Sequence, residues 1–186
     1  MAEREFAPGH IVMPEDDGMV AHLSGLQIPS ISLNATDGST VDLAEGGLTV
    51  VYVYPRISPA IGGTLEGWDA IPGARGCTSQ SCTFRDHFIE LKGVGVKRLF
   101  GLSTQSTDYQ KEAVERLHLP FPLLSDDSLA LSRALELPLF EVGGMTLIKR
   151  LTLIIENGRV EHVFYPVFTP ERNALDVIAW LSSRKT

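Results

Sequence analysis

The sequence predicts an α/β fold in which a central mixed β-sheet is flanked by α-helices. One observation is that the spacing of apolar residues alternates between a period of two, typical of strands, and a period of about 3.6, typical of helices. A second is that turn dipeptides join strand-like segments near both ends of the chain, at Asp37-Gly38 and at Asn157-Gly158. Alternating strands and helices favour a layered α/β arrangement, and the hairpins make the sheet mixed.

The first predicted elements are an N-terminal β-hairpin and a buried strand. Apolar and polar residues alternate over 27–33, and an extended pattern resumes over 39–43 after the turn. Residues 48–54 then form a β-branched and aromatic run that Pro55 ends. Such a run is typical of a central strand that is apolar on both faces.

A long loop precedes the next helix. Residues 58–76 contain several glycines and prolines together with one large side chain, Trp68, and a loop of this length is usually functional. Residues 78–91 carry apolar side chains at helical spacing, and Gly93 and Gly95 follow where a helix commonly ends. We therefore expect a helix directly behind the loop.

The second half of the chain continues this alternation. We expect a strand near 96–102, a helix over 106–117, an extended link over 120–124, a short helix over 128–135, a hairpin of 151–156 with 160–165, and a closing amphipathic helix over 170–181. A chain of 186 residues suits one hydrophobic core. We divide it into an irregular N-terminal arm over 1–22 and one domain over 23–186, with an inserted loop at about 56–76.

Composition and charge argue against several classes of partner. Sixteen Lys and Arg stand against 23 Asp and Glu, which gives a net charge of −7, and no basic run offers a surface for nucleic acid. The longest apolar stretches, 48–54 and 151–155 among them, are far shorter than the roughly 20 residues of a membrane span. Residues 1–6 carry acidic side chains where a secretory signal would carry positive charge, so we expect a cytoplasmic location.

The two cysteines, Cys77 and Cys82, are the strongest chemical signal in the sequence. Two are too few for a disulfide scaffold in a chain of this length, and in a reducing compartment a close pair favours a catalytic or redox role. Cys77 follows the glycine-rich loop at the start of the predicted helix. Free backbone N–H groups and the positive end of the helix dipole favour a thiolate there.

The spacing of the pair has a mechanical consequence. On an intact helix, five residues advance the axis by roughly 7.5 Å and rotate the side chain by about 140°. The two sulfurs then point apart, so a disulfide requires local unwinding. Ser79, Ser81 and Thr83 are weak helix formers, which favours such a switch.

Other interpretations of the pair remain open at this point. Free cysteines are often inert, buried side chains. A zinc site is less favoured, because the chain has no further cysteine and His87 adds only one more ligand.

The segment Gly76-Cys77-Thr78 through Cys82, followed by Phe84-Arg85-Asp86, resembles the signature of the peroxiredoxins of the Q type, the branch of bacterioferritin comigratory protein. Further similar segments are 29–43, 50–55, 101–103, 119–126 and 150–154. The resemblance implies a thioredoxin-like fold and the reduction of hydrogen peroxide and organic hydroperoxides.

The same resemblance implies roles for particular residues and partners. Cys77 corresponds to the peroxidatic cysteine, Cys82 to the resolving cysteine, and Arg150 to the arginine that stabilises the thiolate and the departing oxygen. A thioredoxin or glutaredoxin-like dithiol regenerates the thiols, and no metal or organic cofactor is required. The protein is expected to be a monomer or a homodimer.

Two positions depart from the family pattern. The hydroxyl residue three positions before the peroxidatic cysteine is replaced by Ala74, and the proline seven positions before it is replaced by Ala70. We expect Thr64 to supply the missing hydroxyl ahead of two further candidates, Thr78 and Ser58.

The loop and the helix behind it hold two further candidates. Trp68 either lines or covers the peroxide pocket or anchors the loop on the surface, and Arg85 is a weaker candidate for steering charge near the thiolate. Two other functions compete with a peroxidase. One is a disulfide reductase, although such enzymes usually separate their cysteines by two residues. The other is a thioredoxin-fold binding module in which Ala74 marks lost activity.

Overall fold

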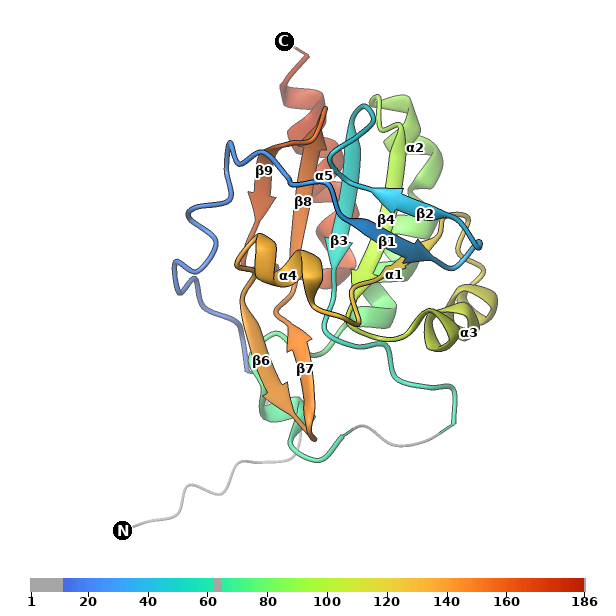
Figure 1. Cartoon of the computed structure of the whole chain (residues 1–186), viewed down its shortest axis with the longest axis vertical. Coiled ribbons are helices and arrows are strands. Elements are labelled where there is room, and N and C mark those ends of the chain that lie inside the picture. Colours follow the sequence, from blue (N-terminus) through green and yellow to red (C-terminus); the bar gives the residue numbers. More distant parts are fainter. Residues whose placement is uncertain (1–11, 62–64, 186) are drawn as a thin grey trace.

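The structure, a computed structural model of the chain, describes residues 12–61 and 65–185 and contains a seven-stranded mixed sheet with the strand order β2-β1-β5-β4-β3-β8-β9 (Figure 1). The strands are β1 (Ser32–Ala35), β2 (Thr40–Asp42), β3 (Thr49–Val53), β4 (Arg98–Ser103), β5 (Leu123–Ser125), β8 (Leu151–Glu156) and β9 (Arg159–Phe164). β3, β4 and β5 run parallel, whereas β1 and β8 flank them antiparallel. The mixed sheet predicted from the sequence is therefore confirmed.

Helices cover both faces of this sheet. They are α1 (Cys77–Asp86), α2 (Phe88–Gly93), α3 (Thr107–Leu117), α4 (Ala130–Ala134) and α5 (Asn173–Ser183), with short 3-10 helices at η1 (Trp68–Ala70) and η2 (Pro170–Arg172). In β3, Val51 and Val53 face the core that includes α4, and Tyr52 faces the core that includes α1 and α5. Figure 1 shows α4 and α5 on opposite sides of the sheet.

Most of the predicted elements are present, including the hairpins β1–β2 and β8–β9 and the buried strand β3. The predicted helix over 78–91 is wrong in one respect, because the backbone leaves helical geometry at His87 and divides it into α1 and α2. Directly after the break, Phe88 packs on Phe121 with ring centroids 5.9 Å apart. The extended link over 120–124 contributes β5 to the sheet.

A third hairpin, formed by β6 (Leu139–Val142) and β7 (Met145–Ile148), was not predicted. It turns at Gly143 and Gly144, both at positive φ, where glycine is the least strained residue. Its apolar side chains pack with Trp68 and Ala74 in a small third core. The hairpin therefore supports the loop that leads into α1.

The described part of the N-terminal arm, residues 12–22, contains neither helix nor strand. The domain boundary at residue 23 and the limits of the inserted loop stay predictions. Within residues 12–61 and 65–185, every helix is too short or too polar to cross a lipid bilayer.

Candidate active site

Cys77 is the first residue of α1, and its side chain is only 4% exposed. Gly76 caps the helix with φ 101° and ψ 13°, a conformation that residues with a Cβ rarely adopt. A Cβ at Gly76 would also lie 2.8 Å from Cγ of Pro170. Both the backbone conformation and the close contact with η2 therefore require glycine immediately before the cysteine.

Arg150 lies directly beside Cys77, although the two are far apart in the sequence. Its Nη2 is 3.1 Å from the Sγ of Cys77 and also donates hydrogen bonds to the carbonyl oxygens of Ala74, at 3.2 Å, and Arg75, at 2.9 Å. Arg150 is 4% exposed. Because a guanidinium stays charged at neutral pH, it supplies both a donor and a positive charge to an anion at this sulfur.

A chain of buried polar side chains holds Arg150 in place. Its Nη1 donates to Oε1 of Gln80, whose Nε2 donates to Oδ1 of Asn173 at 2.9 Å. The hydroxyl of Thr152 donates to the same Oδ1 at 2.6 Å. Sequence reasoning missed these three residues. Gln80 carried a usable signal, since it stands one helical turn after Cys77 and so shares its face of α1.

The Cys77 cavity, a hollow of about 210 Å³, opens beside the sulfur. Trp68 and Thr78 both line it, as do Ser58 and a residue that sequence reasoning missed, Arg56. Trp68 is 5% exposed and packs on Phe140 with ring centroids 6.5 Å apart, so it both anchors the loop and forms part of the cavity wall. Thr64 lies outside the described residues.

Cys82 lies on the same continuous helix as Cys77, and both are free thiols. It is partly exposed, but its neighbours Gln80 and Ser81 are fully buried. The hydroxyl of Tyr52 donates to Oγ of Ser81 at 3.0 Å. Burial raises the pKa of Tyr52 well above its usual range, so the phenol remains a neutral donor. α1 is therefore held more firmly than its weak helix formers alone indicate.

Comparison with known proteins identifies the family. The family model described as Redoxin matches residues 23–178. The chain belongs to this family. Among curated relatives, the chloroplastic peroxiredoxin Q of Sedum lineare is 31% identical over 160 residues, with 84% of this chain and 76% of the relative covered. Peroxiredoxin Bcp of Escherichia coli is 30% identical over 164 residues, with 82% and 91% covered. The resemblance to peroxiredoxins of the Q type is confirmed.

Some relatives are considerably longer than this redoxin. The chloroplastic peroxiredoxin Q of Gentiana triflora is 31% identical over 158 residues, which cover 83% of this chain but 64% of the relative. The chain therefore spans slightly less than two thirds of that protein.

Solved structures confirm the thioredoxin-like peroxiredoxin fold. Peroxidoxin BcpB of Mycobacterium tuberculosis superimposes with a TM-score of 0.69 at 23% identity, covering 88% of this chain and 98% of that protein. The bacterioferritin comigratory protein of Xanthomonas campestris gives a TM-score of 0.67 at 21% identity, with 95% and 100% covered. At these identities the likeness concerns the fold alone.

Arg85 of this redoxin is not part of the wall of the Cys77 cavity. Its Nη1 donates to the carbonyl oxygen of Leu117 at 2.8 Å, and its Nε pairs with Asp86 at 2.9 Å. These contacts link α1 to the end of α3, and a role in steering charge stays a prediction.

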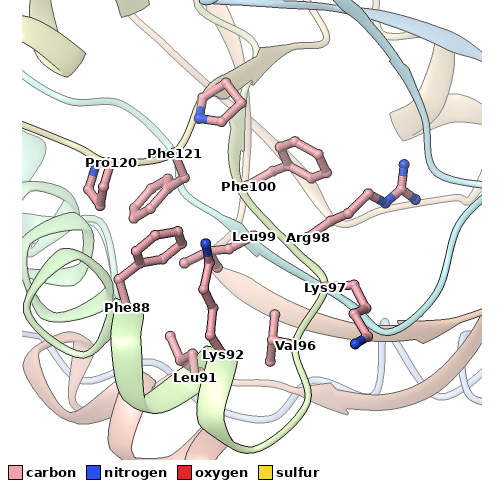
Figure 2. Close-up of a pocket in the computed structure, with 11 residues that line it drawn as sticks. Phe88, Leu91, Lys92, Val96, Lys97, Arg98, Leu99, Phe100, Pro120 and Phe121 are labelled. Carbon is pink, nitrogen blue, oxygen red and sulfur yellow. The ribbon is translucent and has the colours of Figure 1, made fainter.

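A separate hollow of about 210 Å³ lies between α2 and β4, and neither cysteine lines it (Figure 2). Phenylalanine rings and basic side chains surround it, but two of the cations already have partners. The guanidinium of Arg98 donates to Oγ1 of Thr49 at 3.0 Å, and the ammonium of Lys92 lies 4.5 Å from the ring centroid of Phe88. Across the described parts of the chain, no group of three or more His, Cys, Asp or Glu side chains is arranged to hold a metal ion.

Proposed function

We propose that this redoxin is a thiol-dependent peroxidase that reduces hydrogen peroxide and organic hydroperoxides, with Cys77 as the peroxidatic and Cys82 as the resolving cysteine. The observation that carries this proposal is the 3.1 Å contact between the guanidinium of Arg150 and the sulfur of Cys77 beside a small open cavity. Membership of the family and the likeness to peroxiredoxins Q and Bcp support it.

In the first step, the thiolate of Cys77 attacks the terminal oxygen of the hydroperoxide. A sulfur–oxygen bond forms while the O–O bond breaks, and the electron pair leaves on the second oxygen. That oxygen takes a proton and departs as an alcohol, or as water from hydrogen peroxide. Cys77 is oxidised to a sulfenic acid, and Arg150 stabilises the negative charge on the departing oxygen.

The peroxide needs donors that Ala74 does not supply. The first N–H groups of a helix have no acceptor within the helix, so those at the start of α1 can bind a peroxide oxygen together with Arg150. We assign substrate binding to Thr78 and Trp68, which line the cavity, and retain Thr64 as a candidate from the sequence.

In the second step, Cys82 attacks the sulfur of the sulfenic acid. An S–S bond forms, and hydroxide leaves and is protonated to water. A thioredoxin or glutaredoxin-like dithiol then reduces the disulfide by exchange and is itself oxidised. A cytoplasmic location stays a prediction, and several plant relatives are named as chloroplastic. The protein acts as a monomer or a homodimer.

A thiol titration tests the proposal. One equivalent of hydrogen peroxide added to the reduced protein is expected to remove both thiols, and Cys77→Ser is expected to prevent the loss of the remaining one. Thiols that survive in the wild-type protein would overturn the proposal and favour a binding module that lost activity at Ala74.

The order of the two sulfurs has its own test. Cys82→Ser leaves the sulfenic acid at Cys77 without a resolving partner, so dimedone is expected to trap it after one equivalent of peroxide. Mass spectrometry of the Cys77 peptide measures the adduct. An unmodified peptide would contradict the assigned order.

A further inference from the structure

The hollow between α2 and β4, here called the α2–β4 hollow, combines apolar walls with positive charge (Figure 2). Its volume is about 210 Å³, and its apolar wall is formed by Phe88, Leu91, Leu99, Phe100 and Phe121. An apolar cavity of about 150 Å³ is large enough for one benzene ring. The α2–β4 hollow therefore has room for one aromatic ring that carries small polar substituents.

The charged side chains in this wall are all cations. Lys92, Lys97 and Arg98 line the hollow, whereas none of the Asp and Glu residues that the structure describes does so. The chain as a whole has a net charge of −7, so this cluster runs against the overall balance. Arg98 is engaged elsewhere, because its guanidinium donates to Oγ1 of Thr49 at 3.0 Å and to the carbonyl oxygen of Asp42 at 3.2 Å.

Lys92 is the cation best placed to contact a ligand. Its ammonium lies 4.5 Å from the ring centroid of Phe88, and Figure 2 shows it beside that ring, whereas the side chain of Lys97 extends away from the phenyl rings. Within residues 12–61 and 65–185, the ammonium of Lys92 forms neither a hydrogen bond nor an ion pair. Its three N–H donors are therefore available to an anion at the apolar wall.

The backbone of β4 adds further polar groups to the wall. β3 pairs with β4 from Arg98 to Leu102, but β5 pairs with β4 only from Gly101 onward. In a parallel sheet, the N–H and C=O groups of successive residues point alternately to the two neighbouring strands. Because the C=O of Leu102 accepts a hydrogen bond from the N–H of Tyr54, directly after β3, the backbone groups of Leu99 point to the side that β5 leaves open.

Pro122 prevents the chain from filling this gap. The register that pairs Gly101 with Leu123 would make residue 122 the donor to the C=O of Leu99, and proline has no N–H. The N–H of Leu99 has no partner among the described residues either. Leu99 is 4% exposed, and a covered backbone donor and acceptor without partners are costly. A ligand that supplies one acceptor and one donor would satisfy both.

These groups define the chemistry of the ligand. A carboxylate can accept hydrogen bonds from the ammonium of Lys92 and the N–H of Leu99, and a hydroxyl can donate to the C=O of Leu99. The phenyl rings of Phe88 and Phe121 favour an aromatic body. We propose that the α2–β4 hollow binds a small phenolic acid, that is, one aromatic ring bearing a carboxylate and a hydroxyl. This binding site goes beyond the proposed peroxidase function and does not depend on it.

Calorimetric titration of the reduced protein with 3-hydroxybenzoate tests the proposal. Saturable binding at one site is expected. The uncharged analogue 3-hydroxybenzyl alcohol is expected to bind about ten-fold more weakly, because it loses a hydrogen bond to a charged group. Inorganic phosphate, which lacks the ring, is expected to bind more weakly by at least the same factor. Absence of binding by 3-hydroxybenzoate, or equal binding by either comparison compound, would overturn the inference.

Lys92→Gln removes the cation from the wall. Lys92 is exposed, so the substitution carries little risk to folding, and it is expected to weaken binding of 3-hydroxybenzoate about ten-fold. Lys185→Gln is the matched control, since Lys185 is also exposed but lies outside the hollow, and it should bind like the wild-type protein. Equal affinities of Lys92→Gln and the wild-type protein would place the ligand elsewhere and refute the site.

The amide signal of Leu99 locates the ligand on the backbone. In protein labelled with ¹⁵N, titration with 3-hydroxybenzoate is expected to shift the amide resonance of Leu99, because its N–H gains an acceptor. Val163 on β9 lies outside the hollow and serves as the control amide. A Leu99 resonance that stays unchanged at saturation would contradict the proposal. None of these measurements uses peroxide, so failure of the proposed peroxidase function would leave them standing.

Discussion

Arg150 joins the cysteine site to the rest of the molecule. One buried guanidinium contacts the sulfur of Cys77, two carbonyl oxygens of the preceding loop, and the side chain of Gln80. A planar fork of donors can satisfy these acceptors together, whereas an ammonium is a point charge on a flexible stem. The geometry of the donors therefore matters as well as their charge.

Arg150→Lys is expected to lower the rate of thiol oxidation by hydrogen peroxide about ten- to a hundred-fold, which corresponds to the loss of one hydrogen bond to a charged group. Stopped-flow mixing of the reduced protein with peroxide measures this rate. Arg133→Lys on the exposed side of α4 is the control and should react at the wild-type rate. A wild-type rate in Arg150→Lys would mean that charge alone suffices.

Cys77 and Arg150 could be located from the sequence because each stands in a recognisable segment. Gln80 had only its position one turn after Cys77 as a signal. Asn173 had none, since a helix-terminal asparagine looks like an ordinary polar residue until the fold brings it to Gln80. The sequence could not decide whether Trp68 lines the pocket or anchors the loop. In the structure the same indole lines the Cys77 cavity and packs on Phe140.

α1 carries both cysteines and also closes one of the cores. The ring of Tyr52 in β3 stacks on Phe84 of α1 with centroids 4.5 Å apart, and its hydroxyl reaches Ser81 between the cysteines. The sulfurs can meet only if this helix opens locally, so the Tyr52 hydrogen bond opposes resolution. In the proposed mechanism, the strength of this hydrogen bond sets part of the rate at which Cys82 reaches Cys77.

Tyr52→Phe is expected to speed disulfide formation about five-fold, because a net contribution of about 1 kcal/mol from the lost hydrogen bond no longer favours the closed helix. Rapid quenching with an alkylating reagent after a peroxide pulse measures the loss of the Cys82 thiol. Tyr109→Phe is a suitable control, since its hydroxyl has no partner among the described residues. A slower or unchanged rate in Tyr52→Phe would show that opening of α1 does not limit resolution.

The sequence predicted strands and helices well where apolar residues recur at a regular spacing. It failed where one element ends and the next begins. The break at His87 is not marked by a glycine or a proline, and Phe88, which packs on Phe121, follows it directly. The β6–β7 hairpin has a Gly-Gly turn, but its strands are only four residues long. Contact with the loop around Trp68, rather than local preference, stabilises it.

Over the whole molecule, the arm bridges segments that are distant in the chain. Asp17 binds Lys149 and accepts a hydrogen bond from Tyr165, which ties the arm to the start of β8 and the end of β9. The hydrogen bond from Lys149 is the main cause that lowers the pKa of Asp17 from its usual 3.8 to about 2. No local pattern predicts such a contact, so the sequence indicated only an irregular arm.

Asp17→Asn is expected to lower the free energy of unfolding near neutral pH by at most about 1 kcal/mol, because the pair is partly exposed and screened by solvent. The lowered pKa means that the contribution is present in full above the unfolded value of 3.8 and is lost as the pH falls through about 2. Urea unfolding of both proteins across this range measures the difference. If the two proteins still differ in free energy of unfolding below a pH of about 2, the difference does not come from the ionisation of Asp17.

The contact between Gly76 and Pro170 has a consequence for how the protein can be shortened or fused. Pro170 begins η2, and Asn173, three residues later, anchors the amide of Gln80 behind the reactive sulfur. A chain cut before Pro170 would keep both cysteines and Arg150. It would lose Asn173, which holds Gln80, the side chain that accepts a hydrogen bond from Arg150. Pro170 and Asn173 therefore support the residues around Cys77, and a shortened or fused chain must retain them.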